Sequence, residues 1–147
     1  MKLKEKRHRY IEWISPEDMH TETVEWLSEL NFVRDEQDFL NSLVKHYTIQ
    51  LADAGRFEKS KAIIGGILDA EKEVKILMKK IQAHENQLDI MVDDIDQPAM
   101  ERAYKETHRE LMVLMHRYLE EYRGLKKRLF SLISKVIKKE KQQRLLN

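Results

Sequence analysis

The chain has 147 residues, of which 36% are charged, and it contains four glycines, two prolines and no cysteine. This length is typical of one domain, and the composition favours long helices over sheets joined by extended loops. The lack of cysteine excludes disulfides, thiolate nucleophiles and cysteine-bound zinc. A formal net charge of only +1 argues against a strong electrostatic field around the whole molecule.

The N-terminal segment, residues 1–14, is basic and aromatic, and we separate it from a helical domain predicted over residues 15–147. Residues 1–9 carry five Lys or Arg, but no apolar run of a signal peptide follows them. No later run approaches the roughly 18 apolar residues needed to cross a bilayer. We therefore expect a soluble, cytoplasmic protein without a membrane span.

The first helix is predicted over residues 16–53. Ser15 is a suitable N-cap, and Pro16 fits the first helical position, where its missing N–H costs nothing. Apolar residues then recur at steps of three and four. The stretch Asn31–Asp35 offers an alternative boundary, but the continuous helix is preferred. Gly55 is expected to end this segment with a left-handed backbone conformation.

The second helix is predicted over residues 57–93. Gly65 and Gly66 lie inside it, and we attribute them to the close approach of the first helix or to a slight kink. An apolar stripe follows heptad spacing and is interrupted by His84. Its apolar members are Ile63, Ile67, Ala70, Val74, Leu77, Ile81, Leu88, Met91 and Ile95.

The third helix is predicted over residues 98–143, because Pro98 suits a first helical turn. The short connection before it makes the second and third helices antiparallel, which places His84 opposite His108. With the first helix folded back, the sequence predicts an all-α fold: an elongated, antiparallel up-down-up three-helix bundle with coiled-coil-like packing. The stripe of the third helix is Tyr104, His108, Leu111, Met115, Tyr118, Tyr122, Leu125, Leu129, Leu132 and Val136.

His84 and His108 form a predicted polar layer, and Glu22, Glu25 and Glu29 are expected at about the same level. Two interpretations remain open. The pair could be hydrogen-bonded to each other, to a carboxylate or to water, or it could bind zinc or iron. Neither histidine has a glutamate three residues before it, as the repeated motif of di-iron bundles requires. We prefer the structural pair, predict no metal or other cofactor, and keep His84 and His108 as metal candidates.

The end of the third helix is strongly basic, since residues 126–144 carry eight Lys or Arg and a single acid. These cations could bind nucleic-acid phosphates or an anionic surface. The alternative is that they complement the helix dipole and keep a long helix solvated. We call this set the basic pole: Lys126, Lys127, Arg128, Lys135, Lys138, Lys139, Lys141 and Arg144.

The expected function is that of a non-catalytic interaction or structural module. The sequence shows no nucleophile with a histidine and an acid arranged around it, and no small-molecule substrate is evident. A protein partner or a homodimer is expected, with nucleic acid at the basic pole as the alternative and a His/Glu metal bundle as the third possibility. Several apolar residues lie outside the stripes. Phe130, Ile133 and Ile137 are expected to contact the first helix near Tyr47, whereas Phe32 and Phe39 are expected to form a partner or dimer surface.

Overall fold

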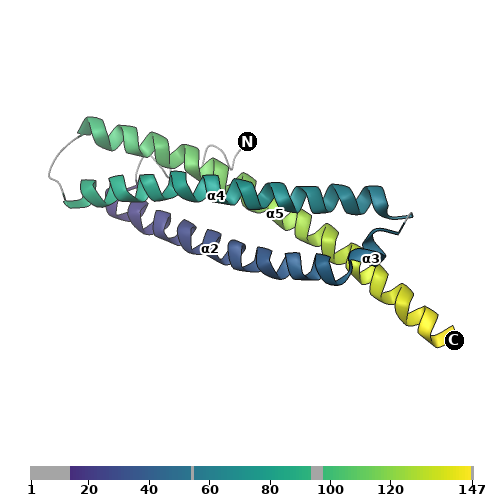
Figure 1. Cartoon of the computed structure of the whole chain (residues 1–147). Helices are drawn as coiled ribbons and strands as arrows, with labels where there is room; N and C mark the ends of the chain where they lie inside the picture. The colour runs from purple at the N-terminus through teal and green to yellow at the C-terminus, as the bar shows by residue number, and fades with distance from the viewer. Residues whose placement is uncertain (1–13, 54, 94–97, 147) are drawn as a thin grey trace. The chain divides into compact units, whose positions relative to one another are not determined.

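The computed structural model describes residues 14–53, 55–93 and 98–146, and every regular element within them is a helix (Figure 1). The all-α prediction is therefore confirmed. Residues 1–13 of the predicted N-terminal segment lie outside the described residues. In the described ranges, no helix combines the length and apolarity needed to cross a bilayer. The helices are α2 (Pro16–His46), α3 (Thr48–Leu51), α4 (Phe57–Asp93) and α5 (Pro98–Leu146).

The start of α2 follows the predicted capping chemistry. The backbone N–H of Asp18 donates to the Ser15 hydroxyl oxygen over 3.1 Å, and Pro16 is the first helical residue. The alternative boundary at Asn31–Asp35 is not used, because α2 runs through it to His46. The preferred, unbroken helix was therefore right across this stretch.

A break at Tyr47 makes the prediction of one helix over residues 16–53 wrong. Tyr47 leaves helical geometry, with φ −107° and ψ 21°, and the short α3 follows. The Thr48 hydroxyl lies 2.9 Å from the carbonyl oxygens of both Val44 and Lys45, to which it donates. Such bonding of a Thr side chain back to the preceding turn commonly bends a helix. Where three helices were expected, the described residues therefore contain four.

The other helix limits differ less from expectation. The bounds of α4 agree with the predicted residues 57–93, whereas α5 continues past residue 143 to Leu146. Gly55 does not adopt the predicted left-handed conformation. The turn is closed instead by hydrogen bonds from Asp53 N–H to Gln50 O and from Arg56 N–H to Asp53 O.

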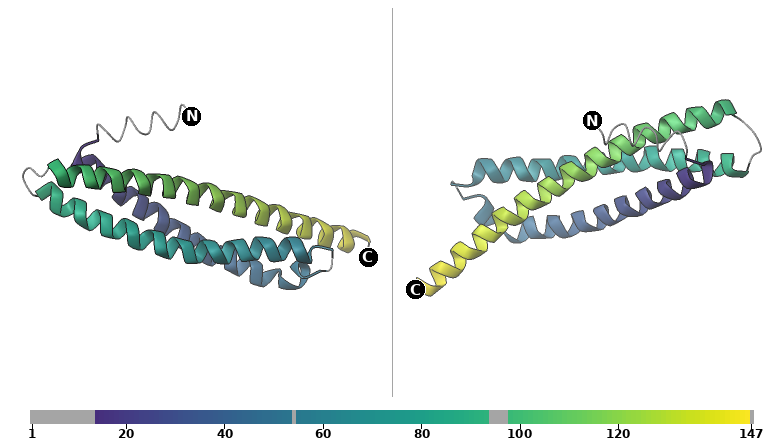
Figure 2. Two further views of the ribbon diagram at one scale, coloured as in Figure 1. Left: turned by 90° about the horizontal axis from the view of Figure 1, so that it is seen from above. Right: turned by 180° about the vertical axis from the view of Figure 1, so that it is seen from behind.

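The described chain divides into two compact units, each of which takes segments from both halves of the sequence. Unit 1 contains the described residues of Met1–Phe32 and of Val74–Arg117. There the first half of α2, the second half of α4 and the first half of α5 lie side by side (Figures 1 and 2). Its fully buried apolar side chains include Met19, Leu30, Ile81, Leu88 and Met115.

Unit 2 contains the described residues of Val33–Glu73 and of Tyr118–Asn147. Its core includes Leu40, Ile67, Leu129 and Val136. Gly66 shows why α4 carries a small residue here, because an added Cβ would lie 2.5 Å from Leu125 Cδ2. The close neighbour of this glycine is therefore a side chain of α5, whereas the prediction attributed the glycine to the first helix or to a slight kink.

The adjacent glycines provide a matched pair for a stability test. A Cβ on Gly65 would meet nothing within 4 Å, so Gly65→Ala should stabilise the helix by about 0.5–1 kcal/mol. Gly66→Ala gains the same helix propensity but must displace Leu125, so its gain should be smaller or absent. Urea denaturation of the two variants measures the difference. Equal gains would contradict the packing at Gly66.

Candidate functional site

The polar layer of unit 1 joins three side chains from three helices. His84 Nε2 of α4 lies 3.0 Å from His108 Nδ1 of α5, which confirms the predicted pairing of these two residues. His108 Nε2 in turn lies 3.0 Å from a carboxylate oxygen of Glu22 on α2. Of the three glutamates expected near the layer, Glu22 makes this contact, whereas Glu25 and Glu29 are exposed. The layer is thus a His–His–carboxylate chain.

Apolar packing surrounds this chain. The indole ring of Trp26 stacks on the His108 ring, with centroids 4.5 Å apart and planes inclined by 20°. His84 and His108 are only 1% and 0% exposed. Heptad spacing brings both histidines inward, because each takes the place of an apolar residue in the stripe of its own helix. The layer is therefore shielded from water on the histidine side and reaches the surface through Glu22.

The Glu22 contact defines one proton position of the layer. A carboxylate oxygen only accepts, so His108 donates from Nε2. The direction of the His84–His108 bond depends on whether His108 Nδ1 also carries a proton. The remaining His84 nitrogen, Nδ1, is buried and has no hydrogen-bond partner among the described residues. Burial and, secondarily, the charge of His108 lower the pKa of His84 to about 4. His84 is therefore neutral at physiological pH.

The layer has limited capacity for metal. Both ring nitrogens of His108 already face partners, namely His84 and Glu22. Within residues 14–53, 55–93 and 98–146, no group of three or more His, Asp or Glu side chains is arranged to hold a metal ion. The arrangement does fit a hydrogen-bond chain that links the three helices, and polar groups in helical cores are known to fix how helices pack.

A second histidine contact in unit 1 was missed by the sequence analysis. His20 Nε2 of α2 lies 2.9 Å from Glu85 Oε1 and 3.8 Å from Asp89 Oδ1, both on α4. This cluster is partly exposed. His20 lies beside the apolar stripe of its helix, so residue spacing does not predict this contact. The rotation of α2 about its own axis brings His20 to α4.

Tyrosine hydroxyls form the polar layer of unit 2. The Tyr118 hydroxyl of α5 donates to the Ala70 carbonyl oxygen of α4 over 2.8 Å and accepts from Gln37 Nε2 of α2 at 3.2 Å. Burial is the main cause that raises the pKa of Tyr118, to about 12. Gln37 is buried, and its side-chain amide is the hydrogen-bond partner of this buried hydroxyl.

Tyr122 extends this layer toward the surface. Its hydroxyl donates to Glu36 Oε1 over 2.7 Å, and Lys126 Nζ lies 2.8 Å from the same oxygen and 5.0 Å from the Tyr122 ring centroid. Burial opposes ionisation of Glu36, but the hydrogen bonds from Lys126 and Tyr122 outweigh it and lower the pKa of that carboxyl. Burial also raises the pKa of Tyr122.

Unit 2 also contains an open apolar cleft of about 360 Å³. It lies between the end of α2, the short α3 and the start of α4, so the break at Tyr47 shapes it. The Ser60 hydroxyl beside it is buried and has no partner among the described residues. The lining residues are Val44, Thr48, Leu51, Ala52, Phe57, Ser60, Lys61, Ile64, Gly65 and Leu68.

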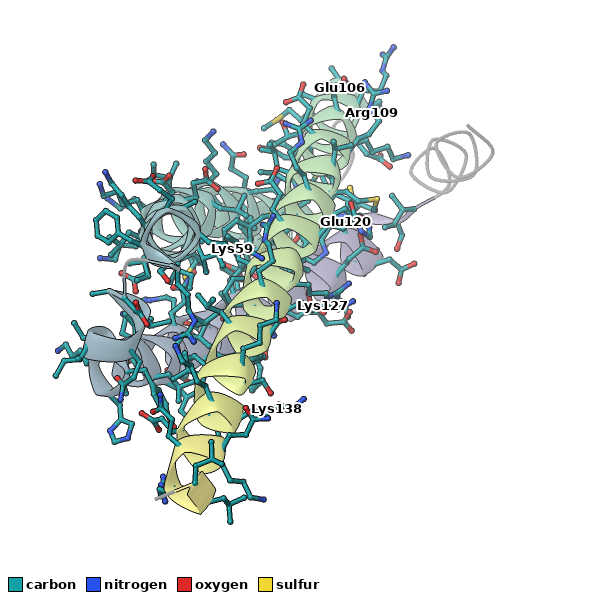
Figure 3. The ribbon with its side chains drawn as sticks, turned by 90° about the vertical axis from the view of Figure 1, so that its right-hand side faces the viewer. Lys59, Glu106, Arg109, Glu120, Lys127 and Lys138 are labelled. Atoms are coloured by element: carbon teal, nitrogen blue, oxygen red, sulfur yellow. The ribbon has the colours of Figure 1, made fainter. Side chains whose placement is uncertain are left out.

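All eight members of the basic pole lie on α5 in unit 2. Two of them are paired: Lys126 with Glu36 at 2.8 Å, and Lys139 with Asp53 at 3.6 Å. The other six form no ion pair within the part of the chain that the structure describes. Figure 3 shows two of these six, Lys127 and Lys138, projecting outward from α5.

Comparisons with known proteins do not identify a family for this chain. No protein-family model matches the chain, and searches of curated proteins and of solved structures found no similar protein.

Proposed function

We propose that the chain is a non-catalytic helical interaction module that binds another protein through α5 of unit 2. One observation carries the proposal. Phe130 and Ile137 are 43% and 46% exposed, and they lie two helical turns apart on one face of α5. Exposed apolar side chains in a row, bordered by polar ones, are typical of protein-binding surfaces. The cytoplasmic location expected from the sequence forms part of this proposal.

The proposed architecture behind this surface is the antiparallel up-down-up bundle. In unit 2, Gly66 faces Leu125 and Ala70 faces Tyr118, so residue numbers rise on α5 as they fall on α4. This opposite order supports an antiparallel pair. A bundle of this kind presents α5 as a preformed helix, which lowers the conformational entropy lost on binding.

Site-specific photo-crosslinking tests the proposed surface. A photoreactive phenylalanine analogue at position 130 should crosslink to a protein in the native cell, whereas the same group at exposed Ala62 of α4 should not. A crosslink to any protein, including another copy of the chain, supports the proposal. Equal yields at both positions, or no crosslinked protein, would overturn it.

Binding of nucleic acid or another polyanion by the basic pole is the second candidate, favoured by its six cations without ion pairs. We expect only weak, nonspecific binding to DNA or RNA, because no element of a recognised nucleic-acid motif accompanies the pole. Fluorescence anisotropy between 50 and roughly 200 mM salt measures it. Submicromolar affinity at the higher salt concentration, reduced by neutralising Lys135, Lys138 and Lys141, would replace the first proposal with this one.

A further inference from the structure

One face of α5 in unit 2 combines exposed apolar and basic side chains. Phe130 and Ile137 are seven residues apart, and Lys127, Lys138 and Lys141 lie beside them at helical spacing. None of the three lysines forms an ion pair among the described residues. The only acid between Tyr122 and Leu146 is Glu140, which accepts a hydrogen bond from Gln50. We call this surface the α5 face.

One face of α2 in unit 1 has the opposite charge. Asp18, Glu25 and Glu29 are exposed at steps of seven and four, and Phe32 beside them is 66% exposed. Residues 16–32 contain no Lys or Arg. An exposed phenylalanine therefore lies among charges of a single sign here too. We call this surface the α2 face.

The two faces also match in spacing. Lys127 and Lys138 on α5 are eleven residues apart, as are Asp18 and Glu29 on α2. Eleven residues span three helical turns and return almost to the same side of a helix. Two opposite-charge pairs can therefore form at once when the helices lie along each other. We infer that the α5 face binds the α2 face of a second copy of this chain.

This inference rests on the proposed role of α5 as a protein-binding surface and names the partner. A polyanion would satisfy the lysines of the α5 face, but it would leave Phe130 and Ile137 without an apolar partner. The α2 face supplies both an exposed phenylalanine and the required charge. Burial of the apolar side chains provides most of the affinity, and the charges select the partner and its register.

The contact joins two different surfaces, which determines the possible assemblies. If both contacts form reciprocally between two copies, they close a dimer, and if they do not, copies add in series. Either assembly uses the same pair of faces. Self-association should weaken as salt rises, because exposed charges are screened.

Charge reversal tests the inference in the full chain. Sedimentation velocity at 50 mM salt should show concentration-dependent self-association of the wild type. Lys127→Glu with Lys138→Glu should raise the dissociation constant by about tenfold or more, and so should Glu25→Lys with Glu29→Lys, because like charges then meet across the contact. Glu25 is chosen over Asp18, since a lysine at Asp18 would also weaken the start of α2.

Mixing the two variants provides the decisive measurement. Each variant alone should be largely monomeric, whereas an equimolar mixture should associate, because the unchanged lysines of the α2 variant can bind the unchanged acids of the α5 variant. In the reverse contact the introduced charges at positions 25 and 29 are opposite to those at positions 127 and 138, and Asp18 alone meets a like charge. Lys75→Glu with Lys79→Glu on α4 changes the net charge as much as the α5 variant does and should associate like the wild type. Circular dichroism confirms that each variant remains helical.

Three results would overturn the inference: a wild type that stays monomeric up to 200 µM, variants that associate as the wild type does, or a mixture without heteroassociation. The proposed function fails differently. If position 130 crosslinks to another protein while the wild type is monomeric, the proposed interaction role is supported, but the inference that the partner is a second copy of the chain is wrong. If position 130 crosslinks to no protein and the wild type is monomeric, both fail.

Discussion

Acidification from pH 7 to pH 4 should lower the free energy of unfolding by about 3 kcal/mol through His84 alone. The unfolded histidine takes up its proton near pH 6.5, whereas burial delays protonation of the folded one until about pH 4. The unfolded state therefore binds more protons between these values. The contribution of neutral His84 to the free energy of unfolding is fully present above pH 6.5 and decreases as pH falls toward 4. Urea denaturation at half-unit pH intervals measures the slope.

His84→Leu should remove most of this acid sensitivity, because its neighbours in the stripe, Ile81 and Leu88, are apolar and a leucine suits the position. His116→Gln on the exposed surface of α5 is the control and should keep the wild-type profile. Identical profiles for His84→Leu and the wild type would refute the buried neutral histidine. Strong stabilisation of the wild type by added zinc, absent in His84→Leu, would instead identify a metal site.

Trp26→Ala should cost about 3–5 kcal/mol of unfolding free energy, the range for removing a buried aromatic side chain. Trp26 is 9% exposed and covers the His108 ring, so its loss also admits water to the layer. The acid sensitivity of the remaining stability should then decrease, because burial is the main cause of the low pKa of His84. Chemical denaturation at pH 7 and pH 5 measures both effects.

Val24→Ala is the matched control for this variant. Val24 lies on the same helix and is 45% exposed, so its truncation should change stability by less than about 0.5 kcal/mol. Similar losses for the two variants would show that Trp26 does not cover the layer.

Periodicity predicted much of the fold and one part of the candidate site. The Ser15 cap, the bounds of α4 and the pairing of His84 with His108 all depend on local chemistry and on residue spacing, which the sequence displays directly. Choosing among Glu22, Glu25 and Glu29 depends both on how α2 is rotated about its axis and on how far it is shifted along that axis. Glu25 differs from Glu22 by about 60° around the helix, whereas Glu29 lies on nearly the same side as Glu22 but about two turns farther along. A counting error of a few residues therefore selects the wrong carboxylate.

The remaining differences between the predicted and the observed structure come from residues whose contacts are not determined by their spacing in the sequence. The hydroxyl of Thr48 bonds to the preceding turn and interrupts the helix, although a threonine at that position fits a continuous pattern equally well. Gly66 signals close packing, but it does not specify which helix approaches. Tyr118 was assigned to the apolar stripe by spacing alone, and its bonds to Gln37 and Ala70 depend on tertiary structure.

The interleaving of the two units along the chain sets the order of events during synthesis on the ribosome. Glu22 and its partner His108 are separated by 86 positions, as are Glu36 and Tyr122. At 5–20 residues per second, roughly 4–17 s pass between emergence of the two members of each pair. Throughout that interval the inward face of α2 lacks its α5 partners. The nascent chain therefore presents an amphipathic helix to chaperones for seconds before either core can close.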